Sequence, residues 1–144
     1  MKIIKFTLLS VFAVLLLFSC SSDDNGGGID KSKILGKWYY FSHTENGIEE
    51  LHDHDGFPLC GEDYLNLKSN NTLEDVMYEY YSTCHEYIDE GTYTLSGNTL
   101  TLIFEEEEEE NFTVVCKVTT LNDTTLILEY QGDKVKLVRN LAID

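Results

Sequence analysis

Leu35-Gly36-Lys37-Trp38-Tyr39-Tyr40-Phe41 is the stretch that decides how this chain folds. It carries the only Trp of the sequence, two residues after a Gly, and it opens the first segment in which polar and apolar residues alternate. Successive side chains of a strand point to opposite faces, so this alternation predicts a strand over Lys37 to His43 with Trp38 and Tyr40 on one face.

Further segments of the same kind follow, each bounded by turn residues. They cover 64–68, 72–82, 91–95, 99–104, 111–120, 124–130 and 134–139, and none of the chain has a convincing helical period. Most connections are short, apart from the polar loop 44–63, so neighbouring strands should pair antiparallel in an up-and-down meander. Closing eight strands into a barrel removes both sheet edges. We therefore expect an all-β fold, an eight-stranded antiparallel β-barrel, and keep a β-sandwich as the alternative.

The N-terminal segment has the features of an export signal rather than of a fold. Residues 1–19 combine early lysines with an apolar run that is too short to span a bilayer. Leu17-Phe18-Ser19-Cys20 resembles the lipobox of bacterial lipoproteins, which implies that Cys20 is lipidated. Residues 20–32 form a small, acidic and Gly-rich tether, and residues 33–144 form the barrel domain.

The acidic cluster after Cys20 resembles the surface-export signal of lipoproteins in Bacteroidetes-type bacteria. That resemblance implies an outer-membrane lipoprotein exposed at the cell surface, and a protein facing the periplasm is the alternative. The formal net charge of −16 argues against nucleic acid and anionic lipid as partners, because both carry negative charge and repel the chain. We expect a monomer that meets the membrane only through its lipid anchor.

Three cysteines remain besides Cys20, and an exported protein is expected to form a disulfide. Cys60 and Cys84 lie in polar, turn-like surroundings at the ends of neighbouring predicted strands, so we pair them. Cys116 lies within an apolar strand and is expected to be a buried free thiol.

From Lys33 to Asn140 the chain resembles the lipocalin-like (calycin) superfamily, in particular small bacterial lipocalin-like lipoproteins. Gly36-x-Trp38 matches the family signature at the start of the first strand, and Arg139 matches the basic residue that packs across that Trp at the closed end of the barrel. The segment from Gly91 to Leu102 resembles a hairpin typical of these proteins, and a Cys60–Cys84 disulfide fits them. A structural role for Gly36, Trp38 and Arg139 follows, with a guanidinium stacked on the indole.

The family resemblance implies that the barrel binds a small hydrophobic or aromatic ligand. Inward Tyr residues would either fill the core or line a cavity with amphipathic walls. The candidate ligand-binding residues are Tyr40, Tyr78, Tyr80 and Tyr93. The alternative is a filled barrel without a small-molecule ligand, which acts as a structural or interaction lipoprotein through its acidic surface or the 44–63 loop.

Metal binding, cofactors and catalysis are not predicted. The candidate ligands for a divalent metal lie in the 44–63 loop: His52, Asp53, His54, Asp55 and Glu62. No adjoining helices support an EF-hand there. The run Glu105–Glu110 is interpreted as a solvated connection that prevents edge-to-edge pairing. Cys84 and His85 are neighbours in a predicted strand end and point apart, so they do not form a nucleophile–base pair, and we expect no enzyme.

Overall fold

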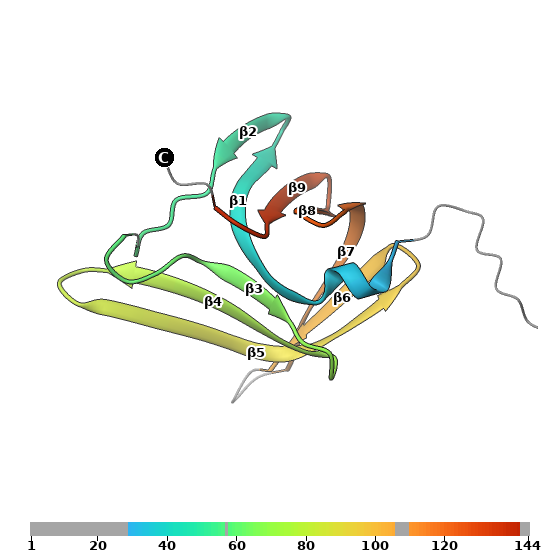
Figure 1. Ribbon diagram of the computed structural model, residues 1–144, viewed down its shortest axis with the longest axis horizontal. Coiled ribbons are helices and arrows are strands. Elements are labelled where there is room, and N and C mark those ends of the chain that lie inside the picture. Colours follow the sequence, from blue (N-terminus) through green and yellow to red (C-terminus); the bar gives the residue numbers. More distant parts are fainter. Residues whose placement is uncertain (1–28, 57, 106–109, 142–144) are drawn as a thin grey trace, which may run out of the picture.

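The computed structural model describes residues 29–56, 58–105 and 110–141 (Figure 1). The predicted signal, the lipidation site Cys20 and most of the tether lie outside these residues, as does most of the Glu105–Glu110 run. A short 3₁₀ helix is followed by nine strands. Their bounds are η1 Lys31–Ile34, β1 Gly36–Glu45, β2 Ile48–Leu51, β3 Tyr64–Leu67, β4 Thr72–Tyr80, β5 Cys84–Ser96, β6 Thr99–Phe104, β7 Phe112–Leu121, β8 Thr125–Tyr130 and β9 Asp133–Val138.

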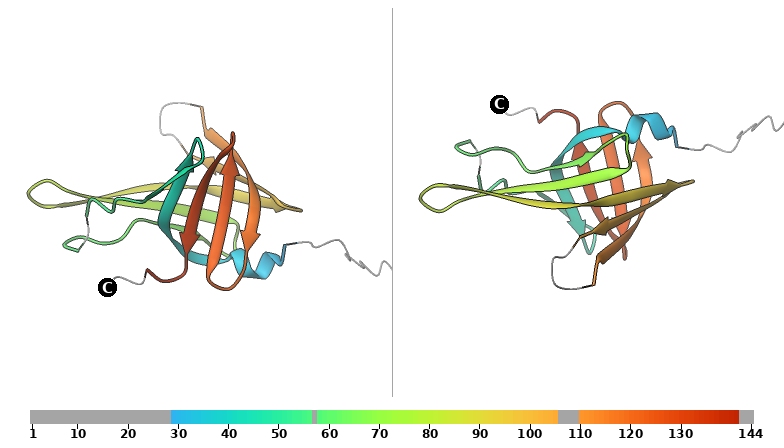
Figure 2. Two further views of the ribbon diagram at one scale, coloured as in Figure 1. Left: turned by 90° about the horizontal axis from the view of Figure 1, so that it is seen from above. Right: turned by 90° about the horizontal axis from the view of Figure 1, so that it is seen from below.

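Eight of the strands close into an antiparallel barrel. The hydrogen-bonded order is β1-β3-β4-β5-β6-β7-β8-β9, and β9 pairs back onto β1, so that Tyr40 lies opposite Leu137. β2 pairs only with the far end of β1 and forms a small hairpin outside the ring. Figure 2 shows the barrel from two opposite sides. The predicted eight-stranded up-and-down barrel is confirmed.

The strands that the sequence did not predict are those that bury nothing. β2 lies within the predicted 44–63 loop, and all four of its residues are exposed. β5 begins at Cys84 rather than at Gly91, and every residue from Cys84 to Glu90 is exposed. Alternation marks a strand only where one face is buried, so these segments carried no such signal. Their pairing with β1 and β4 is held by the backbone.

The core fills the barrel with side chains from every strand of the ring. It is composed of aliphatic residues with one Trp, one Tyr and one Cys. The buried members are Ile34, Trp38, Leu65, Leu67, Leu73, Tyr93, Leu100, Leu102, Cys116, Val118, Leu126, Leu128 and Leu137. Each Leu or Val side chain that is fully removed from water in this way stabilises the fold by about 1.5–3 kcal/mol.

The two ends of the barrel differ. At one end, here called the closed end, η1 and its buried Ile34 cover the interior beside Trp38. At the other, the open end, β4 and β5 continue beyond the ring as a long hairpin, which projects to one side in Figures 1 and 2. Residues 79–88 of this hairpin are called the arm. Within the described part of the chain, no helix is long and apolar enough to cross a membrane.

Candidate functional site

The closed end is held by Trp38 and Arg139. Trp38 is fully buried, and its indole Nε1 donates a hydrogen bond to the carbonyl of Ile34 at 2.7 Å. The guanidinium carbon of Arg139 lies 3.5 Å from the centroid of the Trp38 ring, which is a cation–π contact. The guanidinium also donates to the backbone carbonyls of Lys33, Leu35 and Lys37, at 2.6, 2.7 and 2.8 Å.

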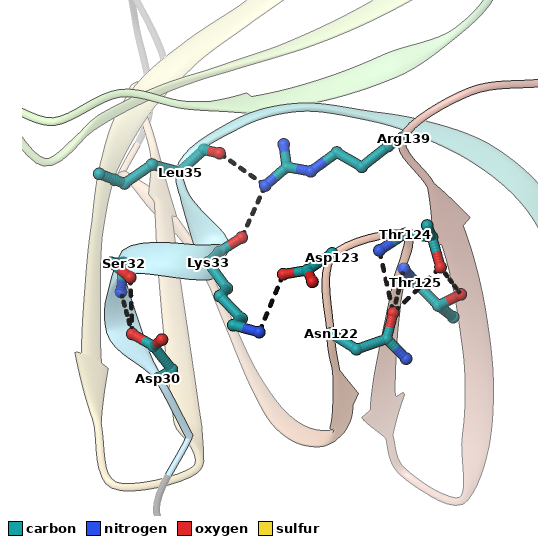
Figure 3. A network of polar contacts seen from close by, with 9 residues as sticks. All are labelled: Asp30, Ser32, Lys33, Leu35, Asn122, Asp123, Thr124, Thr125 and Arg139. Atoms are coloured by element: carbon teal, nitrogen blue, oxygen red, sulfur yellow. Dashed lines mark hydrogen bonds and ion pairs between the residues drawn. The ribbon is translucent and has the colours of Figure 1, made fainter.

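Figure 3 shows two of these bonds and the turns around them. The Asn122 side chain accepts hydrogen bonds from the backbone N–H groups of Thr124 and Thr125, both at 2.9 Å, and so fixes the β7–β8 turn. Lys33 of η1 forms an ion pair with Asp123 in that turn, at 2.8 Å. All these contacts join η1, the β7–β8 turn and the end of β9 to one another. The closed end is therefore a structural plug.

The open end carries partly buried ionisable groups on the inward face of the barrel. Asp75 lies on the inward face of β4, because it pairs across from Leu65 of the core. The hydroxyl of Tyr40 donates to Asp75 Oδ1 at 2.9 Å. Burial raises the pKa of Asp75 to about 6, and the Tyr40 hydrogen bond opposes part of that shift. Asp89 of β5 lies directly opposite Asp75 and raises its pKa further.

A hollow of about 210 Å³ opens above these carboxylates. Its walls combine acidic side chains with two Phe rings whose centroids are 6.4 Å apart, at an interplanar angle of 26°. The lining residues are Asp75, Asp89, Phe104, Glu105 and Phe112. Anionic oxygens beside stacked aromatic faces suit a compact organic cation.

A second cluster lies beside Tyr40 and joins the 44–63 loop to β3. The Nε2 atom of His52 lies 2.7 Å from Oδ2 of the buried Asp63, and the Nδ1 atom of His54 lies 3.7 Å from the same oxygen. The His52 ring packs on the Tyr40 ring with 5.2 Å between centroids, and the His54 ring meets the His52 ring edge-on at 4.7 Å. Burial and the neighbouring His52 lower the pKa of His54, which favours its neutral form.

Only two of the five loop residues weighed as metal ligands belong to this cluster. His52 and His54 converge, but Asp53 and Asp55 are exposed and Glu62 is not among the three grouped donors. The carboxylate that joins the histidines is Asp63, which sequence reasoning missed because it sits where the loop ends and β3 begins. Alternate positions along the loop, rather than an EF-hand spacing, bring the donors together.

The four candidate tyrosines do not share one cavity. Tyr40 is at the open end, whereas Tyr93 is buried in the core and donates to the Lys68 carbonyl at 2.8 Å near the closed end. Tyr78 and Tyr80 were expected to point inward, and this was wrong. The register puts Leu73 and Asp75 on the inward face of β4, so Tyr78 and Tyr80 point outward.

The outward face of β4 misled the sequence reasoning because it is partly covered. Val76 is buried without belonging to the core cluster. The loop segment before β3 lies over Tyr78, since a side chain added at either Gly56 or Gly61 would collide with its ring or Cβ. Both faces of β4 therefore carry apolar residues, and the alternation did not decide between them. Asp75 and Asp89 were also missed: each is a single acid at an inward position of its strand.

The cysteines behave as predicted. Cys60 and Cys84 form a disulfide that ties the loop to the tip of the arm, where Cys84 pairs with Tyr80 beside the β4–β5 turn. Cys116 is a buried free thiol inside the barrel, and burial raises its pKa. Its thiolate form is therefore suppressed, and no reactive role is assigned to it.

This architecture is also found in known proteins. The sequence pattern of the family described as "Lipocalin-like domain" matches residues 34–128. This chain belongs to the lipocalin-like domain family. The match runs from η1 to the middle of β8 and so takes in the buried Trp38 and the open-end carboxylate Asp75.

Solved structures support the lipocalin-like fold. A lipocalin-like protein from Bacteroides uniformis is 19% identical, with a TM-score of 0.61 over 75% of this chain and 99% of that chain. An uncharacterized protein from Bacteroides eggerthii is 13% identical, with a TM-score of 0.57 over 74% of this chain and 98% of that chain. At such identities the likeness concerns the fold alone. Among curated proteins, none matches this chain.

Proposed function

We propose that this lipocalin-like chain is a lipid-anchored protein of the cell envelope that binds a small organic cation with an aromatic or apolar body at the open end of its barrel. The observation that carries the proposal is the hollow of about 210 Å³ in which Asp75 and Asp89 face the stacked rings of Phe104 and Phe112. It narrows the hydrophobic or aromatic ligand expected from the family resemblance to one that also bears a positive charge.

The chemistry of the walls supports a cation rather than a neutral or anionic ligand. Asp75, Asp89 and Glu105 give the hollow acidic groups from three segments, and the whole molecule has a formal charge of −16. A cleft lined by one sign of charge concentrates ligands of the opposite sign. The carboxylate of Asp75 is fixed by the Tyr40 hydroxyl, so little orientational freedom is lost on binding.

The dimensions support a small ligand. Core residues on all eight strands of the ring are at most 6% exposed and fill the interior below the hollow. A long acyl chain that runs down the barrel axis would have to displace them. The ligand that fits is therefore about the size of one substituted ring, held at the mouth.

Attachment to the membrane is proposed from the sequence. The signal and lipobox-like segment ending at Cys20 support a lipid anchor, and the acidic cluster behind it supports display on the outer membrane, at the cell surface or on its periplasmic side. We further propose that the protein is a monomer and that it catalyses no reaction.

Isothermal titration calorimetry with two probes of opposite charge tests the ligand class. 2-Phenylethylammonium is expected to bind, and phenylacetate, which has the same ring and a negative charge, is not. Replacing Asp75 by Asn should weaken binding of the amine by roughly tenfold or more, since one charge partner is lost. Asp123→Asn is the matched control: it removes one exposed charge at the opposite end and should change nothing. Equal binding of both probes, or an unaffected Asp75→Asn variant, rejects the proposal.

The arm favours a second candidate, an interaction lipoprotein with a filled barrel. Tyr81 is 72% exposed, and three other large side chains of the arm are also exposed, namely Tyr80, Tyr87 and Ile88. Tyr is enriched at protein interfaces, and clustered exposed apolar groups mark interaction sites. The 44–63 loop, through which such a protein was expected to interact, is tied to this arm by the Cys60–Cys84 disulfide. Native mass spectrometry of protein from the source cells separates the candidates: a retained small molecule supports the first, and its absence together with a bound macromolecule supports the second.

A further inference from the structure

We infer that His52, His54 and Asp63 form a binding site for a divalent transition metal of the Zn²⁺ type. The three donor atoms, one from each residue, all lie within 4.8 Å of one another. This site is separate from the hollow proposed above and does not depend on its function.

The spacing of the donors fits a common metal ion. Zn²⁺ bonds to imidazole nitrogen and carboxylate oxygen at about 2.0–2.2 Å, which puts neighbouring donors of a tetrahedral site roughly 3.3–3.6 Å apart. The observed separations from Asp63 Oδ2 are 2.7 Å to His52 and 3.7 Å to His54. They lie on either side of that range, and all three donor atoms lie within 4.8 Å of one another, so a small movement of each side chain brings the donors to the spacing that the ion requires.

The donors are held in place before any ion arrives. Asp63 is 4% exposed, and its second oxygen, Oδ1, accepts a hydrogen bond from the backbone N–H of Tyr78 at 2.7 Å. That bond leaves Oδ2 directed at the histidines. The backbone N–H of His52 donates to the Phe41 carbonyl at 2.9 Å, which ties the start of the loop to β1. Support of this kind for the groups behind a ligand is typical of metal sites.

The electrostatic surroundings favour a cation. Asp63 is buried with a backbone N–H and two imidazole rings as its partners, and Glu62, Asp75 and Asp89 add further acidic groups nearby. A divalent ion takes the place of the hydrogen bond between His52 and Asp63. It also competes with the hydrogen bond that the Asp63 N–H donates to His54 Nδ1 at 3.0 Å. The loss of that bond limits the affinity but does not block the site.

The donor set selects the metal. Two imidazoles and one carboxylate suit Zn²⁺, Ni²⁺ and Cu²⁺, whereas Ca²⁺ requires six to eight oxygen ligands. His52 and His54 come from the loop, and Asp63 is the residue directly before β3. A bound ion would therefore fix the loop against the open end. Zinc should therefore stabilise the folded state as well as bind to it.

The test is a titration of ZnCl₂ into the full chain, purified in detergent without a polyhistidine tag. Calorimetry should give one Zn²⁺ per chain, and the melting temperature should rise with zinc but not with CaCl₂. His52→Ala should weaken Zn²⁺ binding at least tenfold and abolish the thermal shift, while His85→Ala, which removes an exposed histidine of the arm, should behave as the wild type.

A second readout guards against a variant that misfolds. Co²⁺ added to the wild type should give visible absorption bands of a His-coordinated ion, and excess Zn²⁺ should remove them. Circular dichroism of His52→Ala should match the wild type before its titration is interpreted. The inference is overturned if the wild type gives no zinc heat, if Co²⁺ shows only the spectrum of the hydrated ion, or if the folded His52→Ala variant binds zinc as well as the wild type.

Discussion

Arg139 concentrates several interactions of the closed end in a single side chain. Its guanidinium stacks on Trp38 and bonds three carbonyls of η1 and the start of β1. The residue also accounts for the glycine of the Gly-x-Trp motif. Gly36 has φ of +99°, and a Cβ there would lie 3.0 Å from an Arg139 nitrogen, so glycine serves both the backbone and the close approach. The motif is therefore a packing signature.

Replacing Arg139 by Ala should lower the free energy of unfolding by about 2–4 kcal/mol, because a cation–π contact and several charge-assisted hydrogen bonds are lost together. Arg139→Lys keeps the charge but loses the planar guanidinium, so its free energy of unfolding should lie between those of the wild type and the Ala variant. Urea unfolding followed by Trp38 fluorescence measures all three proteins. A loss below about 0.5 kcal/mol in the Ala variant would contradict the role given to this residue.

Asp75 should make stability depend on pH. Burial raises its pKa to about 6 in the folded state from the ordinary value of 3.8, so the folded protein holds this proton more tightly than the unfolded chain. The stabilisation is complete below pH 3.8 and is lost as pH rises through about 6. The groups facing Asp75 are Tyr40, Asp89, Asp63 and His52; the two carboxylates raise the pKa, while the Tyr40 hydroxyl and His52 lower it.

Asp75→Asn removes this titration and keeps an acceptor for the Tyr40 hydroxyl. We expect the variant to be more stable than the wild type at pH 7.5 by about 1–3 kcal/mol and equal to it near pH 4. Urea midpoints at the two pH values measure the difference. A constant gap between the two proteins at both values would show that packing, and not ionisation, separates them.

The residues of the open end show how far sequence reasoning reached at a site. Tyr40, His52 and His54 were each named as candidates, in two different sets, and the structure brings them into contact. Asp63, Asp75 and Asp89 were not named. An acidic residue gives no signal of a site by itself in the sequence, because its role depends on which neighbours the closed barrel places beside it.

At the scale of elements, the prediction succeeded where burial was one-sided. β6, β8 and β9 alternate between inward apolar and outward polar residues, and their bounds were found within about a residue. β2 and the start of β5 were not found, since both of their faces meet solvent. The inward face of β4 was assigned wrongly because Val76, on the other face, is also buried.

The Cys60–Cys84 disulfide should govern the stability of the loop and arm. It closes a loop with a sequence separation of 24, which in the chain-entropy model stabilises the fold by about 3 kcal/mol. A Cys60→Ser/Cys84→Ser double variant should lose that amount in urea unfolding. Hydrogen exchange should quicken in the 52–63 loop and in residues 79–88, while β6 to β9 stay protected.

Thiol counting gives the matching control. The denatured, unreduced protein should react at Cys116 alone among these three cysteines, and after reduction at all three. Three reactive thiols without reduction would refute the pairing.

At the scale of the whole molecule, charge repulsion opposes the compact state. The chain has 26 acidic residues against 10 Lys and Arg, and few of the acids have basic partners among the described ion pairs. Raising NaCl from about 20 mM to about 500 mM screens this repulsion and should raise the melting temperature by about 2–5 °C at pH 7.5. At pH 4, where more carboxylates are protonated, the same addition should have a smaller effect. A melting temperature that falls with salt at pH 7.5 would mean that favourable ion pairs dominate instead.

The position of η1 has a consequence for how the molecule is presented to its surroundings. The described chain begins at Ile29, which packs against the core, and η1 follows it at the closed end, whereas the hollow lies at the open end. If the chain carries the proposed lipid anchor at Cys20, the anchor joins the barrel at its closed end, so the mouth is at the end remote from the attachment point. Under that proposal, a solute from the medium reaches Asp75 and Phe104 without passing between the barrel and the membrane.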